Sequence, residues 1–340
     1  MLPTSTWRLL LKTFRNILSA ALCLAAIGAN SQEVGFQSLS IANGDDAPLV
    51  MGIWYPTDAA PISQPLGTFT QSVAPNGAVK TGDRLPLVVM SHGTGGWFGE
   101  HFDTALALAH AGFIVAALSH TGDTYDDTSR QLRISDRPGQ VRRLVDYMTG
   151  QWASHDRLDA GRIGAFGFSA GGFTILAAIG GVPDFRKIPA HCQAHPDYFD
   201  CKLLRSGKGG QITANPSVWI HDSRIKAAVI AAPALGFTFG AEGLTTIRIP
   251  VQLWRAADDH ILPNPDYAEA VRLALPSPPE THIVAKADHF DFLAPCSETL
   301  ARVAPQICLS EPGFDRAAFH AEFNREVVRF FAATLRAPGR

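Results

Sequence analysis

One serine in this chain lies between glycines in a pattern that favours nucleophilic chemistry. Ser169 is the centre of Gly167-Phe-Ser-Ala-Gly171, and Gly172 follows directly. An apolar strand-like segment precedes the serine and helix-forming residues follow it, which is the context of a nucleophile elbow. At such a turn the residues two positions before and after the serine approach closely, so glycine is needed there. We therefore predict that Ser169 is a nucleophile, provided that the rest of the chain supplies its partners.

A base must accept the proton of Ser169, because an alcohol is a weak nucleophile near neutral pH. In enzymes with such a turn, the histidine comes last in the chain, after the final strand. The apolar segment His282–Val284 predicts that strand, and His289 follows it. His260 is a weaker candidate because its loop precedes the last strand. We predict that His289 is the base.

An acid that orients the base should lie between the serine and the histidine, in the loop after a late strand. Val251–Trp254 predicts such a strand, and two adjacent carboxylates, Asp258 and Asp259, follow it. We prefer Asp259 because, in enzymes with such a nucleophile turn, the acid often lies four residues before a proline, here Pro263. Asp258 remains the alternative.

The reaction also needs hydrogen-bond donors for the negative charge that develops on the substrate oxygen. The backbone N–H of Ala170, directly after the nucleophile, is the expected first donor. The glycine-rich loop His92–Gly96 follows an earlier apolar strand, and we predict that Thr94 supplies the second donor. A plain tight turn is the alternative for this loop.

Strands and helices alternate along the chain in the way that predicts a mainly parallel sheet with helices on both faces. The expected strands are 35–41, 49–55, 85–90, 113–118, 163–168, 225–231, 251–254 and 282–284. The expected helices are 101–111, 139–148, 170–179 and 316–335, the last with an apolar stripe of Phe319, Phe323, Val327 and Phe330. In such sheets, ligand and catalytic groups follow the carboxyl ends of the strands, which is where Ser169, Asp259 and His289 lie.

Two segments depart from this alternation. Residues 1–31 carry Arg8, Lys12 and Arg15 before a short apolar run and small residues, which is typical of a secretory signal peptide. Residues 32–340 then form a single domain, with an irregular insertion at about 181–223 that we interpret as a lid over the site. A surface excursion without a substrate role is the alternative for the insertion, and an uncleaved anchor for residues 1–31.

Four cysteines remain after residue 31, and an even number in an exported protein suggests disulfide bonds. We predict local pairing, Cys192 with Cys201 and Cys296 with Cys308. The run His191-Cys192-x-x-His195 could also hold a metal ion, but no second ligand pair at zinc-like spacing accompanies it. We therefore predict neither a metal site nor any organic cofactor.

The remaining polar residues near the predicted sheet edge have no assigned catalytic role. His120, Asp123, Asp126 and Asp127 follow a strand, and we expect a solvated loop rather than a pocket wall or cation site. Phe290 and Phe292 fit an acyl pocket or the core about equally. His101 and His110 are expected to be surface or packing residues.

The charge balance argues against nucleic acid as a partner. Removal of residues 1–31 changes the formal net charge from −2 to −5, and no basic cluster follows. We expect a small-molecule or lipid ester as the substrate and a periplasmic or secreted location. We expect no stable membrane insertion after cleavage. The sequence does not indicate an oligomeric state.

Together, these stretches resemble the α/β-hydrolase superfamily, and more narrowly the bacterial predicted dienelactone hydrolases and the plasma-type platelet-activating-factor acetylhydrolases. The stretches that carry the resemblance span residues 35–335: Trp54-Tyr-Pro56, Ser91–Gly96, Gly112–Val115, Gly167–Gly172, Pro250–Trp254 and Asp288–Phe292. The resemblance implies the α/β-hydrolase fold, the triad Ser169, Asp259 and His289, and oxyanion donors at Thr94 and Ala170. One departure is that authentic dienelactone hydrolases use a cysteine nucleophile.

The predicted function is therefore an exported serine hydrolase that cleaves carboxylic esters through an acyl-enzyme. The main alternative is a phospholipase-like or platelet-activating-factor-acetylhydrolase-like lipid deacylase, which would require an apolar, membrane-preferring lid. An amidase or peptidase would use the same residues. A non-catalytic binding protein on this scaffold would be expected to lack a member of the triad, and none is missing.

Overall fold

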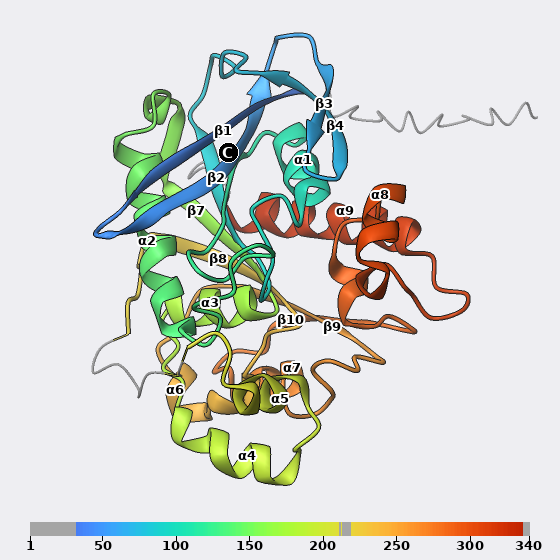
Figure 1. The fold of residues 1–340 in the computed structure, drawn as a ribbon. Helices are drawn as coiled ribbons and strands as arrows, with labels where there is room; N and C mark the ends of the chain where they lie inside the picture. The colour runs from blue at the N-terminus through green and yellow to red at the C-terminus, as the bar shows by residue number, and fades with distance from the viewer. Residues whose placement is uncertain (1–31, 211, 213–218, 336–340) are drawn as a thin grey trace, which may run out of the picture. The chain divides into compact units, whose positions relative to one another are not determined.

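A ten-stranded sheet forms the centre of the molecule in the computed structural model, which describes residues 32–335 except 211 and 213–218 (Figure 1). The strand order is β10-β9-β8-β7-β5-β6-β2-β1-β4-β3. The strands are β1 (Glu33–Asn43), β2 (Asp46–Thr57), β3 (Ile62–Leu66), β4 (Phe69–Pro75), β5 (Leu85–Ser91), β6 (Ile114–Leu118), β7 (Leu158–Phe168), β8 (Ile225–Ala231), β9 (Val251–Ala256) and β10 (Glu280–Val284).

The sheet has a parallel part and a mixed part. Strands β10, β9, β8, β7, β5 and β6 are parallel to one another, whereas β2 runs antiparallel to both β6 and β1. The hairpin of β3 and β4 joins the far edge through a short parallel pairing of β4 with β1. The prediction of a mainly parallel sheet is confirmed, but the sequence patterns did not reveal the β3–β4 hairpin.

Helices cover both faces of the sheet, as predicted. They are α1 (Phe102–His110), α2 (Arg137–Gly150), α3 (Ala170–Ala178), α4 (Ile188–Ala194), α5 (Phe199–Ser206), α6 (Ala241–Leu244), α7 (Ala268–Ala274), α8 (Glu298–Val303) and α9 (Arg316–Thr334). Helix α1 packs against α9 on one face, and α2 packs against α3 on the other. The apolar core is correspondingly divided into two clusters, one under each helical layer.

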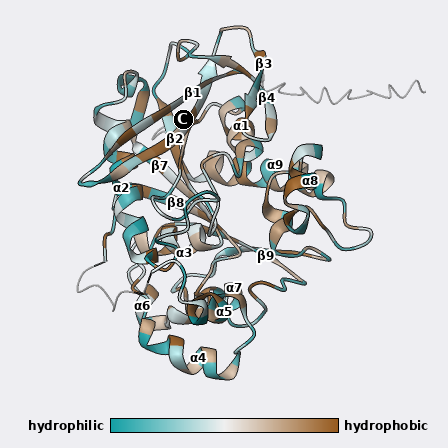
Figure 2. Ribbon diagram, in the orientation of Figure 1, coloured by the Kyte–Doolittle hydropathy of each residue, from teal (hydrophilic) through white to brown (hydrophobic). Residues whose placement is uncertain are grey.

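The hydropathy of each element follows its place in these layers. The central strands β7 and β8 are mostly buried, and Figure 2 shows that helices α2 and α9 carry both hydrophobic and hydrophilic residues. In α9 the predicted stripe turns inward, and the ring of Phe323 lies 6.1 Å from that of Phe166 and 4.8 Å from that of Trp254. The prediction that this stripe docks on the sheet is confirmed.

The insertion at 181–223 is more regular than predicted in its described part. Helices α4 and α5 occupy it, and a disulfide bond joins Cys192 of α4 to Cys201 of α5. The expectation of an irregular segment was therefore wrong here, because short helices of this kind need no long apolar repeat when a disulfide and tertiary contacts hold them.

Two other expectations concern export. The predicted signal peptide, residues 1–31, lies outside the described residues. Among the residues that are described, helices long and apolar enough to span a bilayer are not found.

Candidate active site

Ser169 occupies the sharp turn between β7 and α3, in a backbone conformation that few residues adopt. Its φ and ψ are +54° and −118°, a combination outside the main allowed regions for a residue with a Cβ. The surrounding backbone compensates, since the Ser169 N–H donates to Ala231 O at 2.9 Å and its carbonyl accepts from Ala234 N at 2.9 Å. The result is a strained but well-bonded turn that presents the hydroxyl beyond the carboxyl end of the sheet.

The glycines around Ser169 are required by close backbone contacts. A Cβ on Gly167 would lie 2.2 Å from Gly171 O, and one on Gly171 would lie 1.9 Å from Ser91 O. Both distances are far below van der Waals contact, and the obstructing atoms belong to the backbone and cannot rotate away. These contacts explain why the elbow sequence needs glycine at both positions.

Replacement of Gly171 by alanine is expected to destabilise the protein by about 3 kcal/mol or more, because the new methyl group overlaps the end of β5. Urea unfolding monitored by tryptophan fluorescence measures this change. Gly150→Ala is the matched control, because a Cβ at Gly150 meets no atom within 4 Å. Equal unfolding midpoints for the two variants would contradict the steric account.

A hydrogen-bonded series connects the three residues that the sequence analysis singled out. The Ser169 Oγ lies 3.1 Å from His289 Nε2, and His289 Nδ1 lies 2.9 Å from Asp259 Oδ2. Since the carboxylate can only accept, Nδ1 carries a proton and Nε2 is free to accept one from the serine. The His289 and Asp259 side chains are almost completely buried, so bulk water competes little for these bonds.

The loop after β9 distinguishes between the two adjacent carboxylates. Besides facing His289, Asp259 accepts hydrogen bonds at Oδ1 from the backbone N–H groups of Ile261 and Leu262, at 3.0 and 2.6 Å. Its neighbour Asp258 is exposed to solvent. The structure therefore brings Asp259, and not Asp258, to the histidine. His260 is also exposed and pairs with Asp288 instead.

The loop after β5 lies beside Ser169 at the edge of a shared cavity. Three of its amides already have acceptors: Gly93 donates to Glu100 Oε1 at 3.1 Å, Gly95 to Asp123 Oδ1 at 2.7 Å, and Gly96 to Gly93 O at 3.2 Å. Thr94 lies between them and lines the same cavity as Ser169. This arrangement favours Thr94 as the donor, together with the Ala170 N–H at the start of α3.

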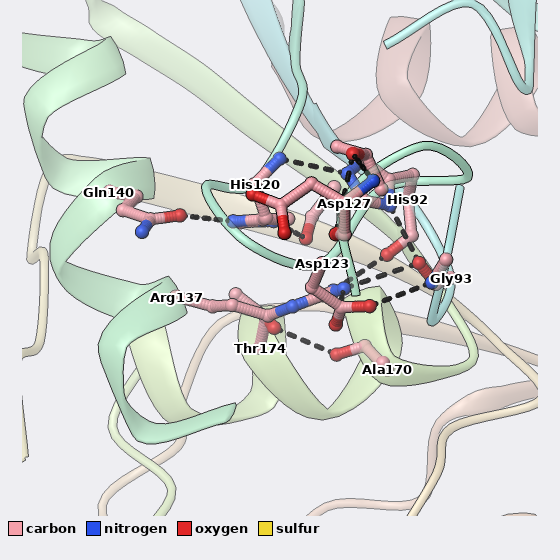
Figure 3. A network of polar contacts seen from close by, with 12 residues as sticks. His92, Gly93, His120, Asp123, Asp127, Arg137, Gln140, Ala170 and Thr174 are labelled. Carbon is pink, nitrogen blue, oxygen red and sulfur yellow. Dashed lines mark hydrogen bonds and ion pairs between the residues drawn. The ribbon is translucent and has the colours of Figure 1, made fainter. Parts of the chain in front are cut away.

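A buried ion pair between Arg137 and Asp123 contacts the loop after β5 (Figure 3). Arg137 of α2 contacts Asp123 Oδ2 at 2.5 Å and donates to the carbonyl oxygens of His92 and Gly93, at 2.8 and 3.2 Å. Asp123 in turn accepts from the Gly95 N–H. The ion pair thus bonds to the backbone on both sides of Thr94, and both charged side chains are less than 5% exposed. We call Arg137 and Asp123 the loop clamp.

Two histidines beside the clamp are fixed in their neutral forms. His120 Nδ1 faces Gln140 Oε1 at 2.7 Å, so it must donate, and Nε2 then accepts from the Ser91 hydroxyl at 2.7 Å. His92 Nε2 accepts from the His120 backbone N–H at 2.9 Å (Figure 3). Burial and the positive charge of Arg137 lower the pKa of His92 to about 4 and that of His120 well below its usual value.

These lowered pKa values predict a loss of stability in mild acid. Below pH 6.5 the unfolded chain binds protons at His92 that the folded chain binds only near pH 4, so acidification favours unfolding. His92 alone should cost about 2 kcal/mol of unfolding free energy between pH 7 and pH 5. Urea unfolding at the two pH values tests this, and the loss should be smaller in His92→Gln. The exposed His155→Gln is the control; an unchanged loss in His92→Gln would refute the assignment.

A cavity of about 520 Å³ opens beside Ser169 and His289. Its walls are mostly apolar, and they come from segments far apart in the sequence. Strand β4 contributes its first residue, Phe69, the loop after β5 contributes Trp97, and the loop after β10 contributes Phe290. Leu300 and Ile307 belong to the segment that the Cys296–Cys308 disulfide closes. Of these wall residues, the sequence analysis considered only Phe290.

A smaller cavity of about 50 Å³ also borders Ser169. Phe199, Asp200 and Leu203 of α5 line it, together with Thr94. Helix α5 of the insertion therefore lies beside Ser169. Ser169 lines both cavities.

Several weighed residues have different surroundings from those expected. The expectation of a solvated loop was wrong for His120 and Asp123, which are buried by partners from α2. It holds for Asp126 and Asp127, which are exposed. Phe290 lines the larger cavity, whereas Phe292 is fully buried in the core.

Two further residues lie near the clamp: Glu100, which the sequence analysis did not consider, and His101, which it expected to be a surface or packing residue. Glu100 accepts from the Gly93 N–H. Burial opposes ionisation of this carboxyl, but the neighbouring His101 and the Gly93 N–H outweigh it and lower the pKa. His101 is a packing residue, and its ring lies between those of Phe166 and Phe168.

Both disulfide bonds of the structure join nearby cysteines, Cys192 with Cys201 and Cys296 with Cys308. These are the pairs that the sequence analysis favoured. The segment closed by Cys296–Cys308 lines the larger cavity, and the segment closed by Cys192–Cys201 contributes Phe199 to both cavities.

The comparisons with known proteins agree with this architecture. The family model of platelet-activating factor acetylhydrolase, isoform II, matches residues 59–144. This stretch contains the β3–β4 hairpin, the Thr94 loop and the loop clamp, but not the three residues of the hydrogen-bonded series. No curated protein matches the chain significantly.

A comparison with solved structures identifies the fold. The chain is similar to a ferulic acid esterase from Streptomyces cinnamoneus, with 19% sequence identity and a TM-score of 0.62. The alignment covers 93% of this chain and 94% of that one. The predicted α/β-hydrolase fold is thereby confirmed.

Proposed function

We propose that this protein is an exported serine hydrolase that cleaves carboxylic esters through an acyl-enzyme intermediate. The observation that carries the proposal is the buried hydrogen-bonded series Ser169–His289–Asp259, which ends in a mostly apolar cavity of about 520 Å³. A nucleophile, a base and an orienting acid at hydrogen-bonding distances are the parts that acyl transfer needs. The match to an acetylhydrolase family model and the likeness to an esterase fold support the ester as substrate class.

In the first half of the reaction, Ser169 Oγ attacks the ester carbonyl carbon and its proton passes to His289 Nε2. The carboxylate of Asp259 stabilises the imidazolium that forms, and the N–H groups of Thr94 and Ala170 bind the oxyanion. His289 then gives the proton to the leaving alcohol oxygen as the carbon–oxygen bond breaks. In the second half, a water molecule loses a proton to His289 and attacks the acyl-enzyme. His289 then gives this proton to Ser169 Oγ as the bond between Oγ and the acyl carbon breaks, which releases the carboxylic acid and regenerates Ser169.

A lipid deacylase is the second candidate, and the edge of the larger cavity favours it. Val303 and Tyr125 line this cavity and are 69% and 72% exposed. Exposed apolar side chains at the mouth of an apolar site are suited to a substrate that remains partly in a lipid phase. The family model that matches residues 59–144 is that of a platelet-activating factor acetylhydrolase, which also supports this candidate.

Export and domain organisation belong to the proposal as well. A cleaved signal peptide at 1–31, followed by one catalytic domain with a lid-like insertion, accounts for the sequence pattern of the N-terminus. The two disulfide bonds support an oxidising location such as the periplasm or the cell exterior.

Hydrolysis of p-nitrophenyl esters from acetate to palmitate, by residues 32–340 and by Ser169→Ala, tests the proposal. We expect turnover by the wild type and a loss of at least about 10⁴-fold in the variant, because the nucleophile is gone. Ser277→Ala, at an exposed serine away from the site, is the control and should retain full activity.

The chain-length profile separates the two candidates. Activity that falls beyond short acyl chains supports the esterase, whereas activity that rises with chain length and with vesicle-bound substrate supports the lipid deacylase. An inactive wild type that still reacts with a fluorophosphonate at Ser169 would refute the substrate class alone. A wild-type protein that shows no turnover and is not labelled at Ser169 would refute the proposed function.

A further inference from the structure

We propose that His191, His195 and Asp266 form a binding site for a divalent transition-metal ion, with zinc as the best-suited ion. The three residues each offer one ligand atom, and these atoms lie within 4.8 Å of one another. The site connects α4 of the insertion to the loop that precedes α7, and these elements lie close together in Figure 1. It takes no part in the ester hydrolysis proposed above and does not depend on it.

Helix periodicity explains why the two imidazoles meet. His191 and His195 are four residues apart at the end of α4, a spacing that places side chains on the same face of a helix. Their ring centroids are 5.1 Å apart. Asp266 approaches from a different segment, and its Oδ2 lies 3.6 Å from His195 Nε2. The sequence analysis found the histidine pair and dismissed it for want of a further ligand, which the fold supplies from 71 residues away.

Neighbouring groups hold both rings in place before any ion binds. The ring of His191 stacks on Phe237 at 3.6 Å with an interplanar angle of 11°, and that of His195 stacks on Tyr198 at 4.5 Å and 13°. The phenol of Tyr267 lies 3.2 Å from His191 Nε2 and donates to Asp200 Oδ1 at 2.9 Å. Such outer groups orient metal-binding histidines and strengthen their binding.

One buried oxygen beside the cluster lacks a hydrogen-bond donor within the described residues. Asp200 is 8% exposed, and its Oδ2 has no hydrogen-bond partner although it lies 3.8 Å from His191 Nε2. A buried carboxylate oxygen without a donor is costly. A cation bound by the neighbouring histidine would lower that cost through the electrostatic attraction alone, without ligation by Asp200.

The donor set selects the class of ion. Two imidazoles and one carboxylate suit zinc and related first-row ions, whereas calcium and magnesium prefer oxygen ligands throughout. Metal–ligand distances of about 2.0–2.2 Å would draw the three atoms somewhat closer together. The cysteines nearby do not compete as ligands, because Cys192 and Cys201 are joined in a disulfide. Water would complete the coordination.

Another cluster of metal-binding side chains in the described part of the chain is less suitable. Glu280, His282 and Glu326 also lie within reach of one another. However, the guanidinium of Arg329 already pairs with both glutamates and supplies their positive charge. This second cluster therefore provides a matched control rather than a competing proposal.

Zinc binding to the chelator-treated protein, measured by isothermal calorimetry and by metal analysis after dialysis, tests the site. We expect one zinc ion per chain and a higher unfolding temperature with zinc, since an ion that binds only the folded chain stabilises it. Calcium and magnesium should give no such effect. His195→Ala and Asp266→Asn should each weaken zinc binding at least tenfold, whereas His282→Ala should bind zinc as the wild type does.

The variants also show whether lost binding reflects lost structure. His195 and Asp266 are both partly exposed, at 35% and 26%, so we expect the metal-free variants to unfold at the wild-type temperature. Wild-type protein that binds no zinc would overturn the proposal. So would binding that survives both substitutions or that disappears in His282→Ala.

Discussion

Asp259→Asn is expected to lower kcat by about 10³–10⁴-fold, whereas Asp258→Asn should change it less than about twofold. The amide at position 259 would present either an N–H or an oxygen to His289. It would thereby lose the charge that stabilises the imidazolium and the fixed preference for a proton on Nδ1. Asp258 has no contact with His289 and is exposed to solvent, so its neutral variant leaves the series intact.

Steady-state kinetics on a short-chain p-nitrophenyl ester measure both variants. The two backbone N–H donors of Ile261 and Leu262 can still bond to the side-chain oxygen of asparagine, so the loop should keep its shape. Similar thermal unfolding of the two variants would establish that the loss is chemical. A larger loss in Asp258→Asn than in Asp259→Asn would reverse the assignment of the acid.

Asp123→Ala is expected to lower kcat by about 10²-fold with little change in KM, through the loop clamp rather than through contact with substrate. The substitution removes the acceptor of the Gly95 N–H and leaves Arg137 buried without its counter-ion. The backbone on both sides of Thr94 then loses its anchor. Because the Thr94 N–H is proposed to bind charge that exists only in the transition state, its displacement should affect kcat first.

The same substitution should also cost about 3–5 kcal/mol of unfolding free energy, the usual consequence of stranding a buried charge. A purely structural role would lower activity by reducing the amount of folded enzyme. Titration of the reactive serine with a fluorophosphonate, carried to completion, counts the intact sites, so that kcat can be given per intact site.

Two variants complete this experiment. In Asp123→Asn the side-chain carbonyl can still accept from the Gly95 N–H, and we expect part of the lost kcat to return. Asp127→Ala, an exposed carboxylate of the same loop, should be indistinguishable from the wild type. A kcat per intact site that is normal in Asp123→Ala would refute the positioning role.

The sequence was most informative where local backbone chemistry dictates residue type. The glycines around Ser169 signal the elbow because a Cβ at either position would collide with backbone atoms. The order of Ser169, Asp259 and His289 along the chain was informative for a similar reason: parallel strands bring their following loops to one edge of the sheet. Local cysteine spacing likewise agreed with the disulfide pairs in the structure.

Features that depend on distant partners could not be predicted. Nothing near Asp123 in the sequence indicates that Arg137 will bury it, so a solvated loop was the natural expectation. The hairpin strand β3 contains Pro65 and no apolar alternation, and only pairing with β4 makes it a strand. Asp266 joins His191 only through the packing of the insertion against the loop before α7.

The β3–β4 turn and the segment closed by Cys296–Cys308 form much of the larger cavity, yet neither contributes to the hydrogen-bonded series at Ser169. Under the proposed function, selectivity and reactivity are thus encoded in separate stretches of the gene. Mutations that lengthen, shorten or replace either stretch can change which esters fit while the reaction centre is inherited unaltered. Laboratory evolution aimed at new substrates would therefore gain most from libraries confined to residues 67–69 and 297–307.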